Sequence, residues 1–105
     1  MNIKPKPPSG ALPYRRLTAV TILRRRQVEF ESGYSRSTIY LRIVQGLWPR
    51  PVSLGARAVG WPAGEVAALN AARIAGLTDR AIRELVVELT AARKTLDLTH
   101  KADVE

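Results

Sequence analysis

The sequence contains no cysteine and only one histidine, His100, among its 105 residues. The absence of cysteine excludes disulfides, thiolate metal sites and cysteine nucleophiles, and a single histidine excludes a multi-histidine metal centre. No apolar run approaches the roughly 20 residues that a membrane-spanning helix needs. No apolar core follows Lys4 and Lys6, so the N-terminus does not resemble a signal peptide. These absences favour a small cytoplasmic protein without a metal or a cofactor.

Charge is abundant but unevenly placed along the chain, whose formal net charge is +8. Residues 1–61 hold eleven basic residues against Glu29 and Glu31, a net charge of +9, whereas residues 62–105 hold six basic and seven acidic residues. Arginine outnumbers lysine in the first part, and its planar fork of donors suits phosphates and guanine edges. No amphipathic helix combines a basic face with an aromatic one, which argues against a membrane surface. The charge pattern therefore predicts a polyanionic partner.

The chain divides into four predicted parts. Residues 1–21 contain four prolines and four basic residues, which is typical of a basic, flexible arm. Residues 22–76 carry the ordered pattern described below, and residues 77–98 predict a C-terminal helix. Residues 99–105 are expected to be a tail.

Two short helices are predicted at the start of the ordered part. Residues 25–32 form the first, with Val28 facing inward, and Gly33 is a typical helix stop. Ser35 is a candidate N-cap for a second helix over residues 35–45. Ile39, Tyr40 and Ile43 fall on its predicted inner side. The opposite side carries the polar residues and one leucine: Ser37, Thr38, Leu41, Arg42 and Gln45.

A β-hairpin is predicted after the second helix. Residues 52–54 and 59–61 alternate apolar with small or polar residues, and residues 55–58 form the turn between them. Helix, turn, helix and hairpin in this order form a winged helix-turn-helix pattern, with Arg57 near the tip of the wing. Trp48 and Trp61 flank the hairpin and are expected in the core. The predicted fold class is mainly α with a small β-hairpin, followed by a C-terminal helix.

The last predicted helices begin at clear signals. Pro62 suits the first position of one helix, which Gly76 ends, and Thr78 can cap the next. Arg93 is expected to favour the C-terminal dipole of that final helix. A heptad-like seam runs along it through Ile82, Leu85, Leu89, Ala92 and Leu96. The seam fits packing against the chain's own core and self-association equally well.

The run from Leu23 to Trp61 resembles the AlpA family of phage regulators and the related small excisionases. The elements that carry the resemblance are Ser35-Arg36-Ser37-Thr38-Ile39-Tyr40 and Gly55-Ala56-Arg57-Ala58-Val59-Gly60-Trp61, with Pro49-Arg50-Pro51-Val52 between them, and the similarity continues to Ile74. It implies a winged helix related to the MerR type, no catalytic centre, and DNA binding for a mobile genetic element. The Leu41-Arg42 order departs from many members, which have arginine directly after the Ile-Tyr pair, so base preference does not transfer.

The resemblance and the pattern together suggest a role for each candidate residue. The second helix is expected to lie in the major groove, with Ser37, Thr38, Leu41 and Arg42 as base-reading candidates. Arg42 suits a bidentate guanine contact, while Leu41 suits either a thymine methyl or burial. Arg57 on the wing is expected at the minor groove. The candidates for phosphate contacts are Arg24, Arg25, Arg26, Arg36 and Arg50.

Several functional alternatives remain open at the level of sequence. The resemblance implies an excision factor that bends DNA beside an integrase, of the tyrosine recombinase type, or a transcription activator that contacts RNA polymerase. Several protomers are expected side by side, because one small module covers little DNA. An RNA-binding module is disfavoured, since the chain lacks a Gly-x-x-Gly clamp and has few aromatic residues. Glu29 and Glu31 face apart on a helix and no acid, base and nucleophile set assembles, which argues against an enzyme.

Overall fold

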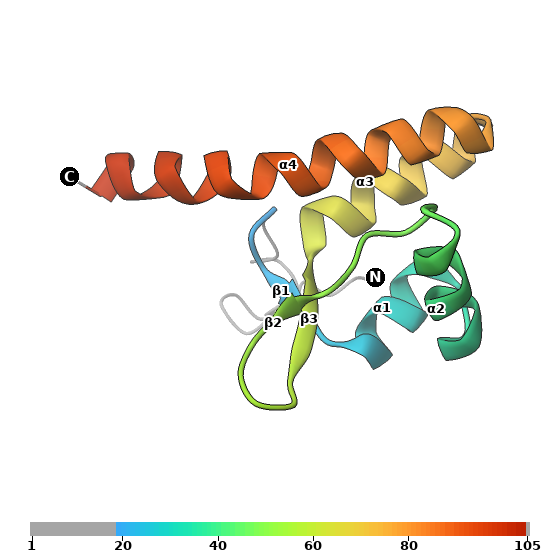
Figure 1. The fold of residues 1–105 in the computed structure, drawn as a ribbon, viewed down its shortest axis with the longest axis horizontal. Helices are drawn as coiled ribbons and strands as arrows, with labels where there is room; N and C mark the ends of the chain where they lie inside the picture. The colour runs from blue at the N-terminus through green and yellow to red at the C-terminus, as the bar shows by residue number, and fades with distance from the viewer. Residues whose placement is uncertain (1–18, 105) are drawn as a thin grey trace, which may run out of the picture.

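The computed structural model describes residues 19–104, with side chains described up to residue 95. The elements follow one another in chain order, and their arrangement is that of a winged helix-turn-helix with an added C-terminal helix (Figure 1). Their bounds are β1 (Ile22–Leu23), α1 (Arg25–Ser32), α2 (Arg36–Val44), β2 (Val52–Ser53), β3 (Val59–Pro62), α3 (Ala63–Ile74) and α4 (Asp79–Val104). The predicted fold class is confirmed.

A small antiparallel sheet joins the wing to the start of the described chain. Its strand order is β1-β3-β2, with Leu23 paired to Trp61 and Val52 paired to Gly60. The β2–β3 hairpin was predicted from its alternating pattern, whereas β1 was not predicted as a strand. Strand β1 pairs with β3 on the side opposite β2. This pairing anchors the wing to the segment that leads into α1.

Local signals in the sequence determine where the two helices of the helix-turn-helix begin and end. Gly33 follows α1 at a φ of 79°, a left-handed conformation that glycine adopts at low cost. The Ser35 hydroxyl accepts a hydrogen bond from the backbone N–H of Thr38 at 3.2 Å, which caps α2 as predicted. The two helices are therefore held in a fixed relation by a three-residue link.

The core lies between α1, α2, α3 and the sheet, and both tryptophans are part of it, as predicted. Trp61 is fully buried, and its indole N–H donates to the Pro49 carbonyl at 2.8 Å. Val28, Ile39 and Leu69 complete the centre of this core from three different helices. This packing fixes the angle between α2 and the wing.

Helix α4 packs its first turns on the same core. Ile82 and Val86 are buried, while Leu85 and Leu89 are partly buried against the core. This part of the seam is therefore used within the chain, whereas Ala92 is exposed. The helix is 26 residues long and continues through positions 99–104, which the sequence assigned to a tail. Figure 1 shows α4 on one side of the molecule, with the wing turn projecting on the other.

Gly60 in β3 gives a first test of this packing. A Cβ at position 60 would collide with Ile22 Cγ2 and lie 2.9 Å from the backbone oxygen of Leu23. We expect Gly60→Ala to lower the free energy of unfolding by about 1–3 kcal/mol, measured by urea denaturation. Adding Ile22→Ala should restore part of the loss, because it removes the nearest atom but leaves the Leu23 oxygen. A neutral Gly60→Ala variant would contradict the close approach of β1.

Candidate nucleic-acid interface

Helix α2 turns one stripe of side chains away from the core. Ser37 and Leu41 are exposed, as expected for base-reading candidates, and Leu41 retains 55% of its accessible surface. Tyr40 was expected inside, but it is 38% exposed. Val44 lies one turn beyond Tyr40 and Leu41 and is 85% exposed, although the sequence analysis did not select it. The spacing of 37, 40, 41 and 44 is that of one helical face, so extending the Ser37–Leu41 stripe by one turn finds Val44.

The other two base-reading candidates on α2 are half-buried and engaged within the protein. The Thr38 hydroxyl lies 3.0 Å from the Ser35 hydroxyl, whose hydrogen bond it accepts, so Thr38 belongs to the helix cap. The Arg42 guanidinium lies over the ring of Tyr34, with its Cζ 5.2 Å from the ring centroid. In the protein without DNA, the Arg42 side chain therefore packs against the turn between α1 and α2.

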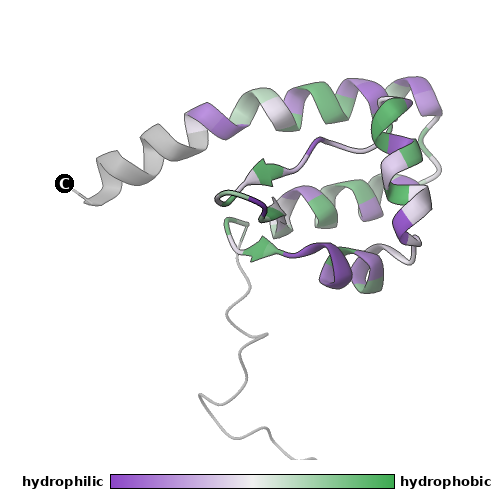
Figure 2. Cartoon of the chain, turned by 60° about the horizontal axis from the view of Figure 1, so that its bottom comes forward, coloured by the Kyte–Doolittle hydropathy of each residue, from purple (hydrophilic) through white to green (hydrophobic). Residues whose placement is uncertain are grey.

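Three arginines gather where α1 begins, and Figure 2 shows this part of the chain as a hydrophilic stretch. Arg24 is exposed, and its Nε donates to the Val59 carbonyl at 3.1 Å, which places it beside the base of the wing. Arg25 is half-buried and forms an ion pair with Glu29. Arg26 is exposed and forms no hydrogen bond or ion pair with any described residue.

The wing presents one arginine at its turn. The Leu54 N–H donates to the Ala58 carbonyl at 2.7 Å and closes the turn, while Gly55 adopts a φ of 148°. Arg57 lies in this turn and is exposed. Arg50 precedes β2 and is exposed as well, while its carbonyl accepts a hydrogen bond from Arg93 at 2.8 Å. Arg57 thus lies in the turn of the hairpin, and Arg50 lies in the segment that enters it.

Positive charge at the helix N-termini is unusual and informative. The positive end of a helix dipole favours acidic side chains in the first turn, and α3 and α4 follow this rule with Glu65 and Asp79. The first turns of α1 and α2 contain no acidic residue. Arginines at 25, 26 and 36 stand there instead, so side-chain charge adds to the anion-binding tendency of each helix end.

The chain also matches a known protein family. The family described as prophage CP4-57 regulatory protein (AlpA) matches residues 21–73, which include both helices of the helix-turn-helix, the wing and most of α3. The chain belongs to the AlpA family of prophage regulatory proteins. The resemblance drawn from the sequence is thereby confirmed.

A relative among curated proteins extends the match. ORF88 of Enterobacteria phage P4, described as uncharacterized, is 43% identical over 72 residues, which cover 69% of this chain and 82% of the phage protein. No solved structure matches the chain.

The described residues meet the requirements of neither a membrane span nor a metal site. Within residues 19–104, no helix is long and apolar enough to cross a membrane. Within residues 19–95, no group of three or more histidine, aspartate or glutamate side chains is arranged to hold a metal ion.

Proposed function

We propose that this AlpA-family protein binds double-stranded DNA of a mobile genetic element, with α2 in the major groove and the wing at the adjacent minor groove or backbone. The observation that carries the proposal is the exposed stripe of α2, Ser37, Tyr40, Leu41 and Val44, together with the exposed arginines at the helix starts and the wing. A helix-turn-helix presents its second helix to base edges in this way. The role is binding rather than catalysis.

Each part of the surface has a separate task in this proposal. Ser37 donates to or accepts from base edges or phosphates near the start of α2, and Leu41 offers an apolar contact for a thymine methyl. Thr38 supports α2 through its cap and reaches DNA only at the helix start. Arg57 enters or grips the minor groove. The sequence-independent phosphate contacts come from Arg24, Arg25, Arg26, Arg36 and Arg50.

Arg42 must leave the Tyr34 ring to reach a guanine. A cation–π contact at a partly exposed position contributes about 0.5–1 kcal/mol, while a bidentate contact to guanine contributes roughly 1–3 kcal/mol of discrimination. Replacing the contact with Tyr34 by a contact with guanine therefore gains free energy at a DNA site that offers guanine in the right register. At other sites, losing the contact with Tyr34 weakens DNA binding. In this proposal, Arg42 contacts Tyr34 in the free protein and moves to a guanine when cognate DNA binds.

Replacing Arg42 tests this assignment. We expect Arg42→Ala to weaken binding to the cognate duplex about tenfold to a hundredfold, with a smaller effect on a random duplex of the same length, in fluorescence anisotropy titrations. Arg80→Ala is the matched control, since Arg80 is a well-exposed arginine of α4 on an i,i+4 ion pair with Glu84. Equal losses on both duplexes would show that Arg42 contacts only the backbone.

Several protomers bound side by side would account for sequence specificity. A single small module buries roughly 600–1,000 Å² of protein surface on DNA. Phe30 and Ile74 are exposed apolar side chains on α1 and α3, and they offer surface for contacts between copies. Such an array would bend the DNA and suit an excision factor acting beside an integrase, while a single copy near a promoter would suit a transcription regulator.

Footprinting on the DNA of the protein's own locus tests the proposed function and separates these two roles. Protection of repeated sites at the attachment site, with a bend detected by circular permutation of the fragment, supports excision. Protection confined to one short promoter site supports transcription alone. Absence of any protected site at the locus would contradict the proposed function.

A further inference from the structure

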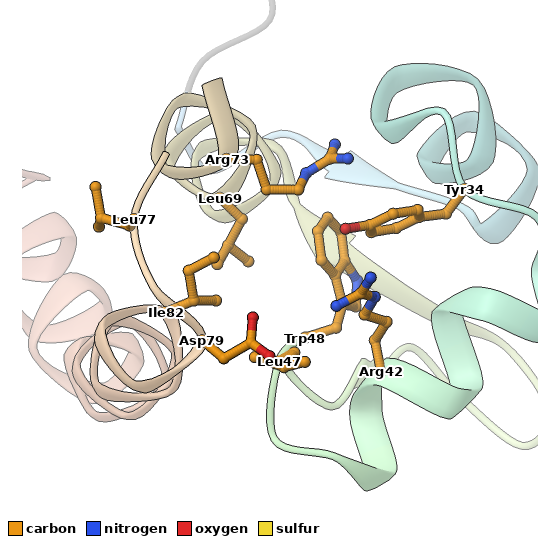
Figure 3. Close-up of a pocket in the computed structure, with 9 residues that line it drawn as sticks. All are labelled: Tyr34, Arg42, Leu47, Trp48, Leu69, Arg73, Leu77, Asp79 and Ile82. Carbon is orange, nitrogen blue, oxygen red and sulfur yellow. The ribbon is translucent and has the colours of Figure 1, made fainter. Parts of the chain in front are cut away.

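A cavity of about 280 Å³ lies behind α2, between the helix-turn-helix and the start of α4. Figure 3 shows Tyr34, Trp48 and Arg42 on one side of it and Leu69, Leu77 and Ile82 on the other, with Arg73 and Asp79 at opposite ends. Its walls thus combine apolar surface with four polar side chains. The aromatic and apolar walls can hold the body of a small ligand, and the polar side chains can orient it.

One cation on the cavity wall has no partner of opposite charge. Arg42 is half-buried, and its guanidinium lies over the Tyr34 ring without a hydrogen bond or ion pair to another described residue. A half-buried cation without a counter-charge costs free energy. An anion in the cavity would supply that counter-charge. Trp48 also lines the cavity, while its indole nitrogen is enclosed by the protein and forms no hydrogen bond.

The other charged groups restrict where an anion can bind. Arg73 lies over the Tyr34 ring at 4.3 Å and already donates to the Ser32 carbonyl and to Asn70, each at 2.7 Å. Asp79 is a carboxylate and repels an anion at its end of the cavity. Arg42 is therefore the cation of the cavity that has no hydrogen bond to another described residue, and it gains most from an anionic ligand.

We propose that this cavity binds a small organic anion, an apolar body carrying a carboxylate or phosphate that pairs with Arg42. The consequence for regulation rests on the proposed function. A ligand that pairs with Arg42 holds it against Tyr34 and removes it from the base-reading surface. Because coupling between two sites is reciprocal, the anion weakens cognate DNA binding and DNA weakens anion binding.

The binding test uses the full protein and four probes. Benzoate and phenyl phosphate carry the two anionic groups on an apolar ring, benzamide is the uncharged counterpart of benzoate, and inorganic phosphate lacks the ring. We expect benzoate or phenyl phosphate to shift the Trp48 indole cross-peak saturably in ¹H–¹⁵N NMR spectra, at millimolar concentration or below, while the Trp61 cross-peak stays in place. The stronger of the two identifies the anionic group. No saturable shift up to 10 mM, or equal binding of benzamide, would overturn the proposal.

Variants with opposite expected effects test the pairing with Arg42. Arg42→Gln should weaken probe binding at least tenfold, whereas Asp79→Asn should strengthen it severalfold by removing the repelling charge. Arg80→Gln is the matched control, because Arg80 is an exposed arginine of α4 that lies outside both the cavity and the proposed DNA-binding surface. Unchanged binding in Arg42→Gln with an unshifted Trp61 cross-peak would overturn the assignment.

The coupling is measured separately at constant ionic strength, with chloride replaced by the probe. A saturating probe should weaken cognate duplex binding about tenfold and random duplex binding far less. A probe that binds at Trp48 without changing cognate affinity would overturn the regulatory consequence. Probe binding is measured without DNA, so its failure is distinguishable from a failure of the DNA-binding function.

Discussion

Affinity for a DNA duplex is expected to fall about 10²–10³-fold between 50 and 200 mM monovalent salt. Each phosphate that the protein neutralises releases condensed counterions, and the slope of log affinity against log salt is about −0.9 per contact. Five of the arginines assigned to the backbone or the wing are exposed, namely Arg24, Arg26, Arg36, Arg50 and Arg57. Five contacts give a slope of roughly −4.5 for one protomer. Anisotropy titrations at several salt concentrations measure it directly.

Single substitutions measure how much each arginine contributes to this slope. Arg26→Ala and Arg57→Ala should each reduce its magnitude by about 1 and weaken cognate and random duplexes alike. Arg80→Ala should leave the slope unchanged, since it lies on α4, outside the proposed surface. A slope of −1 or shallower for the unmodified protein would contradict the phosphate contacts, whatever the affinity at low salt.

The sequence predicted the elements that local signals determine. Gly33 and Ser35 specify the end of α1 and the start of α2 through backbone conformation and a side-chain cap, and both effects act within four residues. The hairpin between β2 and β3 follows from alternation and a short turn, which are also local. These parts of the chain carry the family resemblance, and they form the fold around the candidate interface.

Pairings between distant residues were not predictable in the same way. Strand β1 has only two residues and pairs with β3 across almost 40 positions, so it has no turn or repeating pattern of its own. Arg42 and Tyr34 come from different elements, and their contact depends on how the turn folds back on α2. Tyr40 was placed inside from an idealised helix, although the core next to α2 is filled by Ile39 and the tryptophans. The hydrophobic pattern of the sequence predicts which face of a helix points inward. It does not predict how much of that face the neighbouring elements cover.

The candidate site shows the same division. Exposure of Ser37, Leu41, Arg26 and Arg57 agrees with the sequence analysis, because polar or isolated residues away from the apolar period face solvent. The half-buried state of Arg25 and Arg42 depends on one partner each, Glu29 and Tyr34. Contact of any of these residues with DNA stays a prediction for the experiments above.

Arg93 provides the clearest case of a role that only the fold reveals. It was expected to favour the helix dipole at the C-terminal end of α4, but that helix continues to Val104, so position 93 lies in its interior. Instead, Arg93 forms two hydrogen bonds with the Glu65 carboxylate, at 2.8 and 2.7 Å, and a third with the Arg50 carbonyl. One side chain thus links α4, the start of α3 and the segment that enters the wing.

We expect Arg93→Ala to lower the free energy of unfolding by about 3–5 kcal/mol, because it leaves the buried Glu65 carboxylate without its partner. Glu65 has only 7% of its side chain exposed, so its carboxylate depends on Arg93 rather than on bulk water for its charge partner. The free energy of unfolding of a small domain is about 5–15 kcal/mol in total. The loss should therefore lower the urea midpoint of unfolding greatly.

Two comparisons separate the unpaired charge from loss of packing. Arg80→Ala breaks an ion pair whose side chains are 89% and 66% exposed, and it should cost less than about 1 kcal/mol. The double variant Arg93→Met with Glu65→Leu removes both charges and keeps apolar volume, so it should recover most of the stability that Arg93→Ala loses. If the double variant were as unstable as Arg93→Ala, the three hydrogen bonds themselves would hold α4 and the wing in place. If Arg93→Ala were as stable as Arg80→Ala, the link between α4, α3 and the wing would contribute nothing to the fold.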